Sequence, residues 1–186
     1  MIPDPDILRT IPHVEEAILR IETTHRLAGW RRDLSVGVLV DLGFHALDLA
    51  RDLFGDIRLK SGSLFDENGG FCHDRFDSVA NLLFVTESGT HLRVFVKRGA
   101  EKKCEIFEAV GGEYRLRVAR GSLFLTRNEE VIHDFQAPPD WNQAMLAQLE
   151  DFFRACGNPG SHVFSGKAGL VTMKLLEEAY THAATH

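Results

Sequence analysis

Residues 78–96 read SVANLLFVTESGTHLRVFV, and this stretch predicts two β-strands joined by a tight turn. Apolar and polar side chains alternate from His91 onward, whereas the segment before the turn is apolar on both faces. The residues between, Glu87-Ser88-Gly89-Thr90, are typical of a hairpin. A similar two-residue period runs through residues 57–135, where we expect about seven short strands. Their tight turns favour antiparallel pairing.

Helices and one more strand are predicted outside this block. Apolar residues recur at helical spacing over residues 36–54, with Ser35 as a candidate N-cap and Gly55 as the residue that ends the helix. Residues 13–24 are interpreted as a strand, with helix as the alternative because Glu15-Glu16-Ala17 favours it. Residues 1–10 form an irregular lead-in.

Two helices are expected at the end of the chain, from Asp140 to about Cys156 and from Ser165 to about Ala183. The order is strand, helix, block of strands, two helices, without βαβ alternation. This order predicts an α+β fold, with one open, mainly antiparallel sheet of about 6–8 strands and helices packed on one face. Residues 1–186 are predicted to form a single domain.

The composition and net charge of the chain exclude several classes of protein and make some partners unfavourable. The chain has 186 residues, of which 44% are hydrophobic and 26% charged, so collagen-like and bulk-disordered chains are excluded. A net charge of −6 makes nucleic acid and anionic membranes poor partners. No apolar stretch is long enough to span a bilayer. The acidic, proline-containing start lacks the pattern of a signal peptide, so we expect a cytoplasmic protein.

The three cysteines, Cys72, Cys104 and Cys156, predict neither a disulfide framework nor a redox pair. We expect them to be reduced, with at least two in the core. Cys72-His73-Asp74 consists of ligand-type residues, but three consecutive side chains rarely converge on one ion. No metal site is therefore predicted.

Three ionisable residues interrupt the apolar helix predicted over residues 36–54. Asp41 and His45 are four residues apart and Asp48 follows three later, so they lie along one helical face. A carboxylate beside an imidazole can orient the ring and stabilise its charged form, which suits a general acid/base. The alternatives are a solvated face with a weak ion pair, or a metal site. Gly43 costs ~1 kcal/mol in a helix, which indicates close approach of another backbone or a ligand there.

The loop before this helix holds Trp30, Arg31 and Arg32. Arginine binds carboxylates or phosphates through two parallel hydrogen bonds, so these residues could line a pocket. A solvated basic loop is the alternative.

Residues 37–48, GVLVDLGFHALD, resemble the G-x-h-x-D-h-G-x-H-x-h-D helix (h, apolar) of the Gfo/Idh/MocA family, the glucose–fructose oxidoreductases and inositol dehydrogenases. Trp30-Arg31 resembles the family's substrate-side loop. Residues 106–116 resemble its paired strands, with Glu108 and Val110 in place of the usual Gly and Thr. Residues 169–180 resemble its last helix.

The resemblance implies catalytic roles for Asp41 and His45. His45 would exchange a hydroxyl proton while Asp41 orients it, and hydride would move between a sugar or polyol carbon and NAD or NADP. Substrate binding is assigned to Trp30, Arg31 and Asp48. The resemblance covers only the family's C-terminal, substrate-binding and oligomerisation domain.

The family's N-terminal Rossmann domain has no counterpart here, because the chain contains no G-x-G-x-x-G turn and no Glu-Lys-Pro motif. We therefore expect no cofactor on this chain alone, and a separate Rossmann domain as a possible partner. A non-catalytic binding or assembly module is the alternative function, and an unrelated α+β domain is a third.

Self-association is predicted from the second sheet face. Val79, Leu83 and Val85 alternate with Ala80, Leu82 and Phe84, so both faces of that strand are apolar. Leaving several such residues in water would forfeit a few kcal/mol. We therefore expect a homodimer through the open sheet face, which the resemblance also implies. A loop at residues 66–76 could instead cover it.

Overall fold

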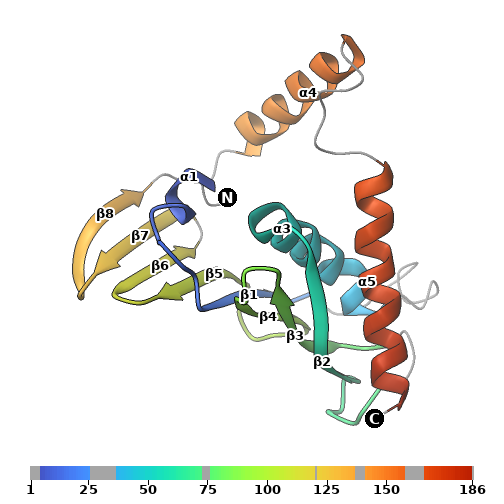
Figure 1. The fold of residues 1–186 in the computed structure, drawn as a ribbon. Coiled ribbons are helices and arrows are strands. Elements are labelled where there is room, and N and C mark those ends of the chain that lie inside the picture. The colour runs from blue at the N-terminus through green and yellow to red at the C-terminus, as the bar shows by residue number, and fades with distance from the viewer. Residues whose placement is uncertain are drawn as a thin grey trace.

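The computed structural model describes residues 5–25, 37–72, 76–119, 121–136, 141–157 and 166–185. Its elements are α1 (Pro5–Leu8), β1 (Glu16–Thr23), η1 (Leu39–Gly43), α3 (Phe44–Phe54), β2 (Ile57–Phe65), β3 (Val79–Thr86), β4 (His91–Arg98), β5 (Cys104–Gly111), β6 (Tyr114–Ala119), β7 (Ser122–Arg127), β8 (Glu130–Gln136), α4 (Trp141–Gly157) and α5 (Gly166–Thr185). Figure 1 shows one sheet with α3 and α5 on the same side and α4 extending away from it.

The eight described strands form one sheet in the order β2-β3-β4-β1-β5-β6-β7-β8. Every neighbouring pair is antiparallel except β1 and β4, which are parallel. The early strand β1 thus lies in the middle of the later hairpins. The predicted α+β fold with one open, mainly antiparallel sheet is confirmed.

Local turn chemistry explains the hairpins. Gly89, between β3 and β4, has φ 89°, and the β7–β8 turn places Asn128 and Glu129 at φ 49° and 68°. Two positive-φ residues in succession match the twist of a two-residue hairpin. The strand at residues 13–24 is confirmed as β1, so the helical alternative there is wrong. The lead-in was expected to be irregular, but it contains the short helix α1.

Gly111, at the end of β5, is required by packing. A Cβ atom on Gly111 would lie 1.8 Å from the carbonyl oxygen of His13, closer than any non-bonded contact allows. The amide of Glu15 also donates to the carbonyl of Val110 at 2.8 Å. The glycine therefore lets the start of β1 lie against β5.

The core lies between the sheet and its helices. Ala80, Leu82 and Phe84 of β3 and Leu92, Val94 and Val96 of β4 are at most 1% exposed. Val38, Leu39, Ala46, Leu47 and Ala50 cover them from η1 and α3, and Leu176 and Ala179 from α5. The helix-covered face thus contains Phe84, whereas Leu83 lies on the opposite face of the same strand.

The opposite sheet face is half-buried and mixed in character. By register, Phe95 lies opposite Asn81 and Leu83 opposite Arg93, so these residues share the open face. Val79, Leu83, Val85 and Phe95 are partly exposed there. The Arg20 guanidinium lies over the Phe95 ring, 5.2 Å from its centroid.

The cysteines are free, but only Cys72 is buried; Cys104 is half-buried and Cys156 exposed. The expectation of at least two core cysteines is therefore wrong. Cys104 begins an amphipathic strand and Cys156 lies on the exposed helix α4, so neither reaches the core. No helix among the described residues is long and apolar enough to cross a membrane.

Candidate functional site

The predicted helix over residues 36–54 begins with a π-helical turn. η1 spans Leu39–Gly43 and α3 continues from Phe44 to Phe54, where Gly55 at φ 74° ends it by donating its amide to the carbonyl of Arg51. Asp41 lies in the π turn and His45 in the first turn of α3. Single π turns inside helices occur frequently at functional sites.

Gly43 closes the π turn and is buried. A Cβ atom there would lie 2.6 Å from Cδ1 of Leu39, which belongs to the preceding turn. The close approach predicted at Gly43 thus exists, but its neighbour is a side chain of the same helix rather than another backbone. The glycine makes room for Leu39, which is fully buried in the core.

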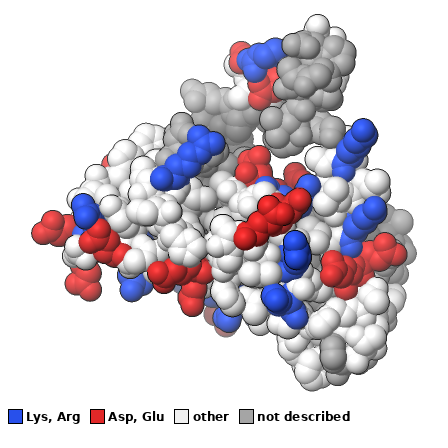
Figure 2. Space-filling model, viewed as in Figure 1, with Lys and Arg blue, Asp and Glu red and all other residues white. Residues whose placement is uncertain are grey.

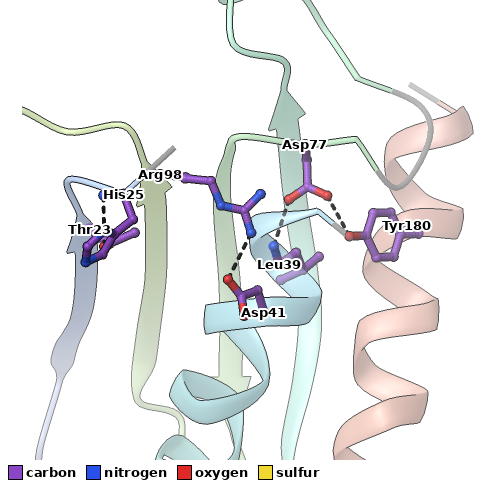
Figure 3. Close-up of polar contacts among 7 residues, drawn as sticks. All are labelled: Thr23, His25, Leu39, Asp41, Asp77, Arg98 and Tyr180. Carbon is purple, nitrogen blue, oxygen red and sulfur yellow. Dashed lines mark hydrogen bonds and ion pairs between the residues drawn. The ribbon is translucent and has the colours of Figure 1, made fainter. Parts of the chain in front are cut away.

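Asp77 caps the beginning of this helix from a distant part of the chain. Its Oδ2 accepts the amide of Leu39 at 2.8 Å, and its main-chain carbonyl accepts the amide of Val38 at 2.8 Å. Its Oδ1 accepts the hydroxyl of Tyr180, from α5, at 2.6 Å. Figure 3 shows Asp77 between the helix start and Tyr180. Helix amides that lack intrahelical partners are thereby satisfied inside the core.

Burial raises the pKa of Asp77, while hydrogen bonds from Tyr180 and Leu39 and the charge of Arg98 oppose that rise. Asp77 is 0% exposed. Because desolvation is the largest contribution, the charged form of Asp77 is disfavoured in the folded protein.

Arg98, the last residue of β4, holds Asp41. Its Nη2 donates to Asp41 Oδ2 at 3.0 Å, and the two side chains are 5% and 28% exposed. The amide of Arg98 donates to the carbonyl of Ser78 at 2.8 Å, which fixes the end of β4 beside Asp77. Figure 3 shows the guanidinium pointing toward Asp41. The orientation of Asp41 therefore depends on a strand that lies 57 residues away in sequence.

His45 is exposed, and its ring packs edge-on against Phe44 with centroids 5.9 Å apart. No hydrogen bond or ion pair joins His45 to Asp41 in the described part of the chain. Both side chains reach solvent, as expected for a helix face that the sheet does not bury. The exposed imidazole can thus meet a ligand, with the Asp41–Arg98 pair one turn earlier.

Asp48 lies where α3 contacts α5. Its Oδ1 accepts the hydroxyl of Thr172 at 3.1 Å, and the same hydroxyl accepts Nη1 of Arg51 at 2.9 Å. Arg51 Nη1 also donates to the carbonyl of Ala168 at 2.9 Å. Asp48 therefore joins two helices in this structure, whereas Asp41 points to the end of β4.

Trp30 and Arg31, the other predicted substrate-binding residues, lie outside the described residues, as does Ser35, the predicted N-cap. His73 and Asp74 of the Cys72-His73-Asp74 stretch do so too. Among the described residues, no cluster of three or more His, Cys, Asp or Glu side chains could hold a metal ion.

Sequence reasoning missed Asp77, Arg98 and Tyr180. Asp77 lies 38 residues from Leu39, and Tyr180 a further 103 residues from Asp77. Nothing in the local pattern of any of the three segments points to the others. An aspartate directly before an apolar strand was the only available signal.

The described strands and helices do not form the usual binding site of a nicotinamide dinucleotide. Such a site uses a parallel strand followed by a glycine-rich turn and a helix N-terminus that binds the pyrophosphate. The one parallel pair among the described strands is β1 with β4. Strand β4 is followed by strand β5, and residues 26–36, between β1 and the helix, lie outside the described residues. The sequence also has no G-x-G-x-x-G.

Comparisons with known proteins show that this chain matches one part of longer oxidoreductases. The structure superimposes on an oxidoreductase from Agrobacterium radiobacter, solved with NAD+, L-tartaric acid and magnesium, with a TM-score of 0.80 and 20% identity. The match covers 97% of this chain and 58% of that chain. The chain has the fold of one part of these oxidoreductases.

Two further comparisons extend the match. UDP-N-acetylglucosamine 3-dehydrogenase from Acidithiobacillus ferrooxidans matches with a TM-score of 0.75 and 15% identity, over 97% of this chain and 57% of that one. A D-apiose dehydrogenase from Paraburkholderia graminis is 28% identical in an alignment of 162 positions that covers 78% of this chain and 42% of the relative. No family model matches. The chain thus spans about half the length of its relatives, and the resemblance to Gfo/Idh/MocA oxidoreductases is confirmed for the fold.

Proposed function

We propose that residues 1–186 form the substrate-binding and oligomerisation domain of a Gfo/Idh/MocA-type oxidoreductase that acts on a sugar or polyol with NAD or NADP. By itself the domain would not be catalytic. The observation that carries the proposal is the position of Asp41 and His45, on successive turns of a partly exposed helix, within a fold whose relatives include a D-apiose dehydrogenase.

In this proposal the chain's own residues bind a hydroxyl-bearing ligand and move one proton. His45, exposed on the first turn of α3, would take the proton from a substrate hydroxyl or return it. Asp41, held by Arg98, would accept a hydrogen bond from an adjacent hydroxyl and orient the ligand. Trp30, Arg31 and Asp48 remain proposed as substrate-binding residues. The nicotinamide would supply hydride chemistry from another part of the enzyme.

A non-catalytic binding or assembly module is the second candidate, and one observation favours it. Asp41 and Asp48 both have protein partners: Arg98 holds the first and Thr172 contacts the second. These contacts stabilise the fold without a substrate. Such a module would form the homodimer through the open sheet face without turnover.

The two candidates are separated by joining this chain to the part of a relative that lies outside the match. The portion of the Agrobacterium radiobacter oxidoreductase outside the match would be joined ahead of residue 5 of this chain. Dehydrogenation of a panel of sugars and polyols is then followed by NADH absorbance. We expect turnover with at least one compound, and a loss of about 100-fold or more in His45→Ala.

Ala147→Glu, at an exposed position of α4, is the control and should leave turnover unchanged. Titration calorimetry of the unfused chain with NAD+, NADH, NADP+ and NADPH should show no binding. Turnover unaffected by His45→Ala would refute the catalytic role. A folded, inactive fusion would favour the assembly module. Micromolar dinucleotide binding by the unfused chain would contradict the proposal that the dinucleotide binds to another part of the enzyme.

A further inference from the structure

The helix that carries Asp41 and His45 begins without a cap from its own sequence. Val38, at the N-cap position, has an apolar side chain that cannot accept an amide. Asp77 takes this place from the segment before β3: its carboxylate accepts the amide of Leu39 and its carbonyl accepts the amide of Val38, both at 2.8 Å. The start of the helix is therefore set by a residue that is distant in sequence.

The hydroxyl of Tyr180, on α5, holds Asp77 in this place. It donates to Asp77 Oδ1 at 2.6 Å, whereas the amide of Leu39 binds the other carboxylate oxygen. Burial raises the pKa of Asp77, and the hydrogen bond from Tyr180 is the largest of the effects that oppose this rise. Figure 3 shows the Tyr180 side chain projecting from α5 toward the carboxylate. Removing the hydroxyl would take this donor from a fully buried acid.

The cap matters for the site because of the π turn that follows it. A π turn holds one residue more than an α turn, and η1 contains Asp41 whereas His45 follows in α3. One residue of an α-helix corresponds to a rotation of about 100°, so relaxation of η1 to α geometry would redirect Asp41 relative to His45. Leu39 opposes this change at two points, because its amide binds Asp77 and its buried side chain fills the space beside Gly43.

The direction of Asp41 is seen in its ion pair with Arg98. Nη2 of Arg98 lies 3.0 Å from Asp41 Oδ2, and the amide of Arg98 donates to the carbonyl of Ser78, the residue after Asp77. Charged side chains gather on the surface over α3 and α5 in Figure 2, whereas Asp77 and Arg98 are 0% and 7% exposed. These two residues therefore act on Asp41 from buried positions.

We propose that Tyr180 and Asp77 are positioning residues of the candidate site: they hold the π turn and, through it, the orientation of Asp41. The consequence for a ligand rests on the proposed function, whereas the orientation of Asp41 is a property of this chain alone. Thr172 also connects α5 to α3, but its hydroxyl contacts Asp48, which lies beyond the π turn. The two contacts of α5 thus have different roles.

Tyr180→Phe tests the proposal, because it removes the hydroxyl and keeps the ring. In the unfused chain, NMR measures the chemical shift of the Asp41 carboxyl carbon and the exchange rate of the Leu39 amide. Arg98→Met provides the reference shift of Asp41 without its ion pair. We expect Tyr180→Phe to move the Asp41 signal toward that reference, and the Leu39 amide to exchange at least about tenfold faster. Asp77→Asn, which leaves one acceptor atom in place of two, should change both in the same directions.

Two controls separate this role from general loosening of the fold. Tyr114→Phe, at the other tyrosine of the chain, should leave both measurements unchanged. Val118→Ala removes core volume from β6, which β1 and β5 separate from β4, and should leave the Asp41 signal in place although it lowers stability. In the fusion described above, Tyr180→Phe should lower kcat/KM about tenfold through misplacement of the ligand, and Tyr114→Phe should leave it unchanged.

An Asp41 signal that stays unchanged in Tyr180→Phe overturns the proposal, even if the Leu39 amide exchanges faster, because Tyr180 would then only stabilise the fold. An equal change of the Asp41 signal in Val118→Ala overturns it too, as does an unaltered kcat/KM of Tyr180→Phe in an active fusion. A fusion without turnover of any compound would refute the proposed function, while the NMR comparison would still decide whether Tyr180 orients Asp41.

Discussion

At the residue scale, the candidate site depends on two buried residues of opposite charge type, Asp77 and Arg98. Asp77 satisfies two amides at the helix start, and Arg98 supplies a positive charge near it while it pairs with Asp41. Neither residue belongs to the motif that marks the helix. Removing either one leaves polar groups in the core without their partners, and this is why small substitutions there should have large effects.

Arg98→Met is predicted to lower the free energy of unfolding by about 2 kcal/mol, because it leaves Asp41, which is 28% exposed, without its ion pair. Urea unfolding followed by circular dichroism measures the change. Arg117→Met is the control, since Arg117 pairs with Glu108 at 2.8 Å but is 55% exposed. There we expect less than about 1 kcal/mol. Equal losses of unfolding free energy in the two variants would show that the Arg98–Asp41 pair stabilises the fold no more than an exposed ion pair does.

Asp77 is predicted to make stability depend on pH. Burial raises its pKa above the ordinary value of 3.8, so the folded state binds the proton more tightly than the unfolded state. The contribution of Asp77 to stability is therefore greatest below the unfolded pKa and decreases as pH rises through the folded pKa. Compared with Asp77→Asn, the wild type should gain stability as pH falls from neutral toward 3.8.

Thermal unfolding of both proteins across this pH range measures the effect as the difference between their melting temperatures. The comparison cancels the general acid sensitivity that other carboxylates give to both proteins. A difference that stays constant, or that decreases toward acid pH, would contradict a raised pKa for Asp77.

At the scale of the elements, the contact between α3 and α5 connects the candidate site to the end of the chain. Thr172 of α5 is fully buried and joins Asp48 and Arg51 of α3 through one hydroxyl. Tyr180, two turns further along α5, reaches Asp77. Helix α5 thus supports the site at two points, although it contributes no residue of the motif.

Thr172→Val keeps the volume of the side chain but removes the hydrogen bonds that its hydroxyl makes with Asp48, Arg51 and the carbonyl of Ala168. We predict a loss of about 1–2 kcal/mol in the free energy of unfolding, because Asp48 and Arg51 lose a buried partner. Urea unfolding again provides the measurement. Thr181→Val, at an exposed position of the same helix, should change stability by less than about 0.5 kcal/mol. A neutral Thr172→Val would show that these hydrogen bonds contribute little to the stability of the contact between α3 and α5.

At the scale of the whole molecule, the sheet has one covered face and one open face. The open face combines half-buried apolar residues such as Leu83 and Phe95 with charged residues such as Arg20 and Arg93. Such a face can pack against its own copy across a two-fold axis, where apolar residues meet at the centre and charges at the rim. Homodimerisation through this face remains a prediction.

Leu83→Glu tests the dimer, since Leu83 lies on the open face and is not part of the core. We expect the wild type to have twice the mass of one chain by light scattering at micromolar concentration, and Leu83→Glu to be monomeric. The expected cause is the burial of a charge in an apolar contact. Ala184→Glu, at the exposed end of α5, is the control and should remain dimeric. A wild type that is monomeric at all concentrations would refute the dimer.

The sequence by itself determined the order and type of the strands and of the three long helices, since alternation, helical spacing and turn residues are local signals; it did not predict α1 or the π turn. It also placed Asp41, His45 and Asp48 on one helix, because positions three and four residues apart share a face. The tertiary structure alone decided which partners these residues have. Arg98, Asp77 and Thr172 reach the helix from three other segments, and only the sheet order and the packing of α5 bring those segments together. The placement of Phe84 inside likewise depended on which face the helices cover, because β3 is apolar on both faces and its pattern does not specify the buried one.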